Sequence, residues 1–181
     1  MHRNKVISLL NRYQPTILKE IVAKTKMLEF IQTNENCFER TLEIGHITGS
    51  AWLLNKNLDQ ALLIHHAKLN KWFQLGGHAD GDSDILNVAI KEAQEESGIL
   101  AIEAVIPDIF DIDIHEIPAN KKDQVHFHYD IRFLLKVTSN EEIQINEEAK
   151  ALAWIGKDES KLPTIEESIL RMHQKWISLI K

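Results

Sequence analysis

The chain has 181 residues, an apolar fraction of 44% and a formal net charge of −6. This length and composition fit one globular domain with a short accessory segment. A mildly acidic protein is poorly suited to hold a nucleic-acid backbone by bulk attraction, which argues against a nucleic-acid partner. A phosphorylated substrate would need local neutralisation, for which a divalent cation is the simplest candidate.

The single cysteine, Cys37, excludes an intrachain disulfide and a CxxC zinc or redox pair. A cysteine content this low agrees with a reducing compartment. The first ten residues carry too broken an apolar group for a signal peptide. No apolar run approaches the roughly 20 residues that a membrane span needs. We therefore expect a cytoplasmic protein without a membrane partner.

Residues 1–35 are predicted to be helical, because apolar residues recur at spacings of three and four and no glycine interrupts them. We interpret residues 1–40 as an N-terminal helical extension. Its apolar stripe is suited either to covering the main body or to a partner subunit, which would give a homodimer.

The residue pattern changes near Gly45, where β-type segments begin. A helix is predicted from Ile85 to Ser97, with Gly98 as its C-cap. Thr164 to Ile180 is expected to form a closing helix. Strands or β-rich segments are predicted at residues 46–54, 61–66, 72–75, 99–117, 125–137 and 149–155. Strands with helices before, between and after them indicate a layered α/β sandwich over residues 41–181.

Three carboxylates stand out on the predicted helix, because Glu92, Glu95 and Glu96 lie at i, i+3 and i+4. Residues at that spacing are neighbours on one helix face, about 5–6 Å apart at Cβ. Their mutual repulsion would be relieved by a hard cation such as Mg²⁺, which prefers oxygen ligands. The preceding pair Gly76-Gly77 lets the backbone approach the helix closely. Taken alone, the same run of acids is typical of a solvated helix face.

The stretch from Gly77 to Ile99 resembles the Nudix box. That motif is a glycine, five residues, a glutamate, seven residues, then Arg-Glu-apolar-x-Glu-Glu-x-Gly-apolar. Here the glycine is Gly77 and the end reads Lys91-Glu92-Ala93-Gln94-Glu95-Glu96-Ser97-Gly98-Ile99, with the spacing preserved. The resemblance covers roughly residues 40–181. It implies a Nudix-type α/β/α sandwich with a mixed β-sheet and a metal-dependent hydrolase.

Two positions depart from the motif. Ser83 stands where the family has its first glutamate, and Lys91 where it has an arginine. Asp82 or Asp84 is placed to substitute for that glutamate, and Ser83 or Asp82 to cap the helix. Lysine keeps the positive charge of the arginine but loses its bidentate fork.

The resemblance implies a site in which Glu95 and Glu96 bind Mg²⁺ or Mn²⁺, and Glu92 is a further ligand or the base that activates water. Lys91 would hold Glu92 in place. Many family members add a carboxylate from outside the box. For that role we favour Glu147 or Glu148 over Asp130 and Glu116.

Nine histidines are a high number for this length, and His126 and His128 share one side of a predicted strand. No third ligand stands at a convincing zinc spacing, so substrate binding is the preferred role. The expected substrate contacts are Gly77, His78, His128 and Trp72. Phe73 and Tyr129 are further aromatic residues that could stack on a base, although core packing explains strand aromatics equally well.

The leading hypothesis is hydrolysis of a phosphoanhydride in a nucleoside diphosphate linked to another group, a small nucleotide-type substrate. The alternative, motivated by Ser83 and Lys91, is a catalytically weakened Nudix-like module that binds nucleotides or regulates. A nucleophilic role for Cys37 has no support, because no base partner is evident.

Overall fold

The computed structural model describes residues 2–119, 124–147 and 149–180. It begins with two helices, α1 (Asn4–Arg12) and α2 (Leu18–Thr33). The strands are β1 (Gly45–Leu54), β2 (Ala61–His66), β3 (Trp72–Phe73), β4 (Leu75–His78), β5 (Ile102–Ile117), β6 (His126–Val137) and β7 (Ala149–Ile155). Helix α3 (Ile85–Ser97) follows β4, and the short 3-10 helix η1 (Glu159–Lys161) precedes α4 (Glu167–Leu179).

The seven strands form one mixed sheet, in which β1 is central. The main order is β3-β2-β1-β6-β5, while β4 pairs with β1 and β7 pairs with β2. Strands β1 and β6 run parallel over ten residue pairs, and the other pairings are antiparallel. Strands β4 and β2 pair with β1 along the same edge. The register of β4 sets its glycine pair directly beside the middle of β1.

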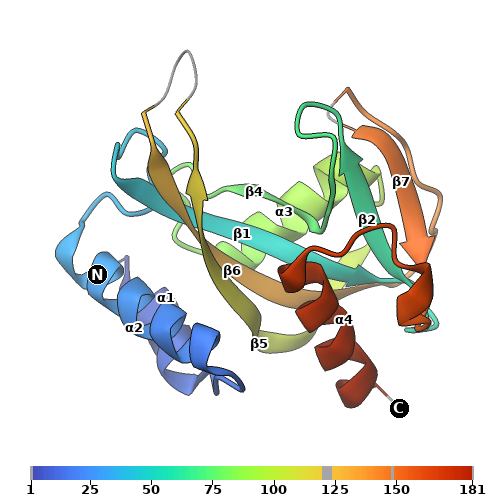
Figure 1. Cartoon of the computed structure of the whole chain (residues 1–181), viewed down its shortest axis with the longest axis horizontal. Coiled ribbons are helices and arrows are strands. Elements are labelled where there is room, and N and C mark those ends of the chain that lie inside the picture. Colours follow the sequence, from blue (N-terminus) through green and yellow to red (C-terminus); the bar gives the residue numbers. More distant parts are fainter. Residues whose placement is uncertain (1, 120–123, 148, 181) are drawn as a thin grey trace.

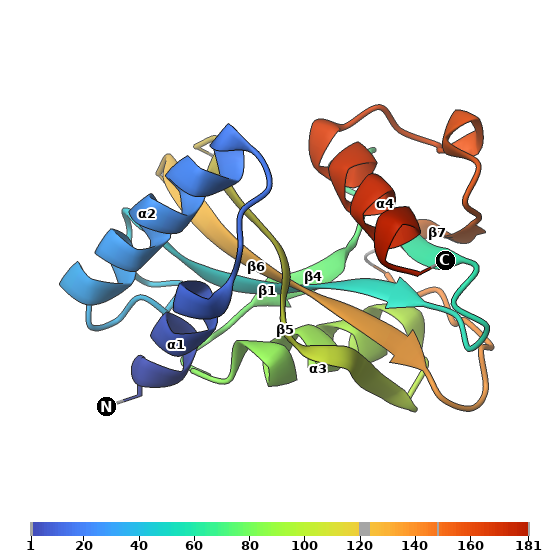
Figure 2. The same cartoon turned by 90° about the horizontal axis from the view of Figure 1, so that it is seen from below.

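Helices cover both faces of the sheet, so that the α/β/α layering is confirmed (Figure 2). Helix α3 packs closely against β1: a Cβ added at Gly49 would lie only 3.0 Å from atoms of Ile85 and Val88 of α3. On the other face, Trp52 and Leu54 of β1 pack with Trp176 of α4 in a second apolar cluster. Successive residues of β1 therefore alternate between the α3 side and the α4 side.

The N-terminal helices are docked on the body of the protein along edge strand β5 (Figure 1). Met27 and Ile31 of α2 are fully buried in the same apolar cluster as Ile47 of β1 and Ile85 of α3. Lys5 of α1 forms an ion pair with Asp84, just before α3. The C-terminal part of α2 therefore covers the main body, whereas four apolar residues of the predicted stripe are exposed, namely Ile17, Leu18, Ile21 and Val22. The homodimer stays a prediction.

Most predicted elements agree with the observed ones. Helix α3 has the predicted bounds and ends at Gly98, which has the left-handed φ of 75° expected of a C-cap glycine. The closing helix begins at Glu167, three residues later than predicted. No helix among the described residues is both long and apolar enough to cross a membrane.

A network of buried charges lies on the sheet face that also carries α4. Asp111 accepts hydrogen bonds from Arg132 of β6 and from Arg171 and Lys175 of α4. Glu20 of α2 forms ion pairs with Arg171 and Lys175. Burial alone would raise the pKa of Asp111, but the hydrogen bond from Arg171 and the charge of Arg132 hold it well below its usual value. The network thus joins α2, α4, β5 and β6.

Candidate active site

Helix α3 begins with an acidic turn that fixes its first residues. Asp84 is the N-cap, and its carboxylate accepts a hydrogen bond from the N–H of Asn87. The prediction that Ser83 or Asp82 caps the helix is therefore wrong. Asp82 instead accepts hydrogen bonds from the N–H of Asp84 at 2.8 Å and from the Asn87 side chain at 3.1 Å. Its carboxylate is used in the turn before the cap, which moves the cap to Asp84.

Two of the three carboxylates of α3 meet the glycine pair of β4. Oε2 of Glu96 accepts a hydrogen bond from the N–H of Gly76 at 2.8 Å. The carboxylate of Glu92 lies against Gly77 so closely that a Cβ on that glycine would collide with it. Glu96 is only 6% exposed, whereas Glu92 is half-buried. The sequence Gly-Gly therefore lets the helix carboxylates approach the backbone of β4.

Glu95 and Lys91 lie on the exposed part of α3. Lys91 forms an ion pair with Glu95, with Nζ and Oε1 3.6 Å apart. The pairing expected from the resemblance was with Glu92. An exposed i, i+4 pair of this kind contributes little to stability.

The loop before β7 reaches the end of α3. Asn146 donates a hydrogen bond from its side chain to the backbone carbonyl of Glu95 at 3.2 Å. Glu147 follows directly and is exposed. Glu148, the other predicted carboxylate outside the box, lies outside the described residues.

The two weaker choices for that carboxylate have other surroundings. Asp130 is buried and accepts hydrogen bonds from Thr48, Ser50 and Arg132. Although burial opposes ionisation, the charge of Arg132 keeps the pKa of Asp130 below its usual value. Glu116 is paired in register with Phe127 at the far end of β5. The carboxylate of Asp130 is thus already used in hydrogen bonds on the polar face of the sheet.

Five histidines lie on the same face of the sheet as Asp130, next to the buried charge network. Rings of His46, His78 and His128 have centroids 4.8 to 5.0 Å apart, and His115 and His126 adjoin His128. Burial, then the neighbouring histidines, lower the pKa of His46 to about 4 and that of His128 to about 2. These two imidazoles are therefore neutral at pH 7.

Spacing along the sequence offers no third zinc ligand, but the fold brings a third histidine close, because nitrogen atoms of His46, His78 and His128 lie within 4.8 Å of one another. His46 was missed because its neighbours come from strands far away in the sequence. One signal was present: His46, Thr48 and Ser50 alternate along β1, which marks a polar face on a buried strand.

The predicted substrate contacts are only partly brought together. Gly77 and His78 adjoin on β4, and His128 lies beside His78. Trp72 instead stacks on His65 and packs against the apolar cluster under α4. Tyr129 stacks on Phe30 of α2, with ring centroids 3.9 Å apart.

The surroundings of Phe73 and Cys37 indicate that both residues serve in packing. Phe73 packs against the apolar cluster under α3. Cys37 is fully buried where the helical segment meets the sheet, and its carbonyl accepts the N–H of Ile47. Burial raises the pKa of its thiol to about 11, which disfavours the thiolate that a nucleophile needs.

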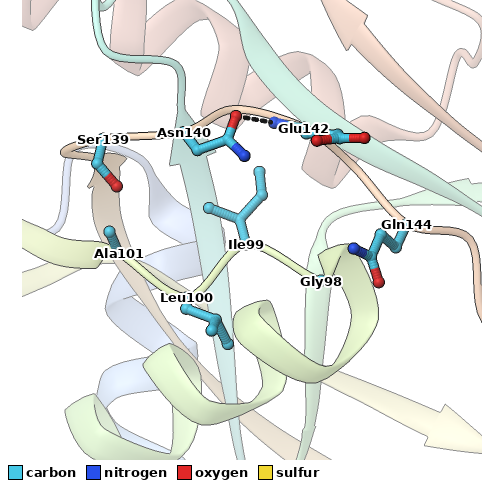
Figure 3. Close-up of a pocket in the computed structure, with 8 residues that line it drawn as sticks. All are labelled: Gly98, Ile99, Leu100, Ala101, Ser139, Asn140, Glu142 and Gln144. Carbon is cyan, nitrogen blue, oxygen red and sulfur yellow. Dashed lines mark hydrogen bonds between the residues drawn. The ribbon is translucent and has the colours of Figure 1, made fainter.

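A shallow pocket lies at the C-terminal end of α3, apart from the carboxylates (Figure 3). It is formed by residues 98–101 and by the segment after β6, and the Ile99 side chain points toward Asn140. Asn140 accepts a hydrogen bond from the N–H of Glu142. None of the predicted site residues lines this pocket.

Comparison with known proteins identifies the family. The model of the NUDIX domain matches residues 46–175, most of the chain. The protein therefore belongs to the Nudix family and is a Nudix hydrolase.

Relatives agree with this assignment. The chain is 29% identical over 115 residues to the asymmetrical bis(5'-nucleosyl)-tetraphosphatase of Rattus norvegicus, covering 62% of this chain and 75% of that protein. It is 27% identical over 133 residues to a probable DHNTP pyrophosphohydrolase of Lactococcus lactis subsp. cremoris, covering 68% and 78%. The solved structure of a Nudix-family hydrolase from Clostridium perfringens is 27% identical in sequence and has a TM-score of 0.56. The match covers 75% of this chain and 98% of the chain of that hydrolase.

Proposed function

We propose that this protein uses a divalent metal ion to hydrolyse a phosphoanhydride in a nucleoside diphosphate or polyphosphate linked to a second group. The observation that carries the proposal is the meeting of α3 with the glycine pair, where Glu96 accepts the N–H of Gly76 and Glu92 lies against Gly77. The carboxylates are thereby oriented by the backbone as well as by the helix.

The donor type of the helix carboxylates suits a hard divalent cation, although no three of them form a compact cluster among the described residues, so that side chains would have to converge on the ion. Glu92, Glu95 and Glu96 offer carboxylate oxygens on one helix face, and oxygen ligands are those that Mg²⁺ and Mn²⁺ accept. We expect Glu147 to add a fourth carboxylate. The hydrogen bond from its neighbour Asn146 to the backbone of Glu95 supports this choice. When bound, such an ion polarises a phosphoryl group and lowers the pKa of an attacking water.

Each protein residue then has a defined task. Glu96, buried and hydrogen-bonded, would be the best-oriented ligand, with Glu95 at the exposed side. Glu92, held near Gly77, would be a further ligand or take the proton of the attacking water. Lys91 would compensate part of the negative charge.

The substrate class is supported by the names of the relatives, an asymmetrical bis(5'-nucleosyl)-tetraphosphatase and a probable DHNTP pyrophosphohydrolase. Gly77, which lies against Glu92, would contact the phosphate-bearing part of such a substrate. His78 and His128 lie beside each other on the other side of β4, so they would contact a group further from the carboxylates. Trp72 would contribute only to a more distant group, because its indole is stacked on His65.

The test is cleavage of a substrate panel by the purified full chain. Dinucleoside polyphosphates, ADP-ribose-like compounds, nucleotide sugars, coenzyme A and nucleoside triphosphates are each incubated with Mg²⁺ or Mn²⁺, and products are separated by chromatography. We expect one class to be cleaved, and Glu96→Gln to lower kcat by about 10³-fold. Glutamine retains an acceptor for the Gly76 N–H, so the variant should stay folded.

Glu167→Gln on α4 is the matched control, since Glu167 is an exposed carboxylate paired with Lys19. It should retain wild-type activity. If the wild type cleaves no compound but binds a nucleotide without metal, the hydrolytic proposal fails. The weakened binding module suggested by Ser83 and Lys91 is then the correct description.

A further inference from the structure

We propose that His46, His78 and His128 form a binding site for a transition-metal ion of the Zn²⁺ class. The site lies on the opposite side of β4 from the carboxylates of α3. The proposal does not depend on the phosphoanhydride chemistry, because imidazole nitrogens and carboxylate oxygens select different metals.

The fold places the three rings together through strand register. His46 of β1 is the in-register partner of His128 on the parallel strand β6. Thr48, two residues along β1 and on the same face as His46, is the partner of His78 on β4. Three neighbouring strands therefore each contribute one imidazole to one face of the sheet. Their backbones are fixed by ladder hydrogen bonds, which preorganises the group.

Distances between the rings suit a shared ion. One nitrogen from each histidine lies within 4.8 Å of the others. Zn–N bonds of about 2.0–2.1 Å in tetrahedral geometry require nitrogens roughly 3.4 Å apart. Closing that difference needs shifts of roughly 1 Å at the rings, a size that changes in side-chain torsions supply.

Unpaired polar atoms point to a missing ligand. His46 is only 3% exposed, and among the described residues neither of its ring nitrogens makes a hydrogen bond of ordinary geometry, its one backbone neighbour of this kind being Leu42, which raises its pKa. Within the same part of the chain, Nε2 of His128 is also buried without a partner. Buried polar atoms are normally satisfied, and leaving them unsatisfied costs free energy. A bound cation would use these lone pairs.

Position relative to β4 separates this site from the carboxylates. Gly77 faces Glu92, and the next residue, His78, points to the other side of the strand. His126, whose Nδ1 lies 2.8 Å from the Gln124 carbonyl, borders the group. Three protein ligands leave a fourth position for water or for one oxygen of an anion.

The experiment is calorimetric titration of the metal-stripped full chain with Zn²⁺, in excess Mg²⁺ to occupy the carboxylates. Co²⁺ is added in parallel, because its visible absorption reports four- or five-coordinate nitrogen ligation. We expect one Zn²⁺ per chain, and a Co²⁺ spectrum with intense visible bands.

Variants locate the ion. His78→Ala and His128→Ala, both at half-buried positions, should each weaken Zn²⁺ binding at least 100-fold. His65→Ala, a half-buried histidine on β2 outside the group, should bind like the wild type. Glu96→Gln should also retain the Zn²⁺ site while losing Mg²⁺-dependent activity. Circular dichroism checks that each variant is folded.

The proposal is overturned if the wild type binds no Zn²⁺ under these conditions. It is equally overturned if His78→Ala and His128→Ala bind as tightly as the wild type. Loss of Zn²⁺ binding in Glu96→Gln, with the histidine variants unaffected, would place the ion at the carboxylates instead.

Discussion

Gly76 donates its backbone N–H to Oε2 of Glu96 at 2.8 Å, across the contact between β4 and α3. A side-chain carboxylate is thereby oriented by a backbone that the sheet holds in place, through pairing of Gly76 with Ser50. Placing a functional group on rigid elements is what a catalytic constellation requires. The neighbouring contact between Gly77 and Glu92 allows this arrangement to be tested.

Gly77→Ala should lower activity with little effect on folding. The added Cβ would meet the flexible end of the Glu92 side chain, which can move away. We expect kcat/KM to fall by about 10–100-fold, because small misplacements of catalytic groups are costly. The free energy of unfolding, from urea titration, should change by less than about 1 kcal/mol. Gly156→Ala, where the Cβ would enter open space, is the control. Equal activity of the two variants would contradict the assigned role of Glu92.

Lys91 is expected to act through charge rather than through stability. Its partner Glu95 is exposed, so Lys91→Gln should leave the free energy of unfolding within about 1 kcal/mol of wild type. The same variant should lower kcat/KM by about tenfold in steady-state kinetics, while Lys91→Arg should match or exceed the wild type. Lys68→Gln, at another exposed lysine, serves as the comparison. An unchanged kcat/KM in Lys91→Gln would argue that this lysine has no catalytic role.

Helix α3 and its C-cap could be predicted from the sequence because their signals are local. Gly98 follows the last periodic residue and adopts the left-handed conformation that glycine allows. The first turn was harder, because Asp82, Ser83 and Asp84 are all good capping residues. Only the geometry shows that Asp82 is used by the turn and Asp84 by the helix.

The histidine group could not be predicted, because it depends on strand pairing over long sequence distances. His46 meets His128 through the parallel pairing of β1 with β6, and His78 through β4. Spacing along the chain carries no information on such register. The buried charge network was missed for the same reason, since Asp111 meets Arg171 60 residues later.

Met27→Ala should destabilise the whole protein and not α2 alone. Met27 is fully buried in the cluster that includes Ile85 of α3. A large-to-small change in such a core costs about 2–5 kcal/mol. Chemical denaturation should remain a single transition, seen equally by far-ultraviolet circular dichroism and tryptophan fluorescence. Leu18→Ala, at a mostly exposed position of the same helix, should change stability by less than about 0.5 kcal/mol. Two separate transitions in the wild type would show that α1 and α2 fold independently.

Stability should decrease at acidic pH through Asp111. Its pKa in the folded protein is held below the unfolded value, so its contribution is complete above the unfolded pKa and is lost as pH falls toward the folded one. We expect the free energy of unfolding to fall as pH decreases below about 4. Asp111→Asn should lower stability at pH 7 by about 3–5 kcal/mol, because Arg132 and Arg171 lose their shared counter-charge.

The same variant should show a weaker dependence of stability on pH below about 4, as measured by urea titration at several pH values. Glu43→Gln, at an exposed carboxylate, should follow the wild-type curve. A pH dependence unchanged by Asp111→Asn would mean that other carboxylates dominate acid unfolding.

The charge network also constrains the order in which the chain can reach its native state during synthesis. Asp111 obtains two of its three cationic partners from positions 60 and 64 residues further along the chain. Until α4 has left the ribosome, β5 would have to bury a carboxylate without them. A nascent chain that ends before Arg171 should therefore keep this side of the sheet open and available to chaperones. Native closure would wait for the last helix.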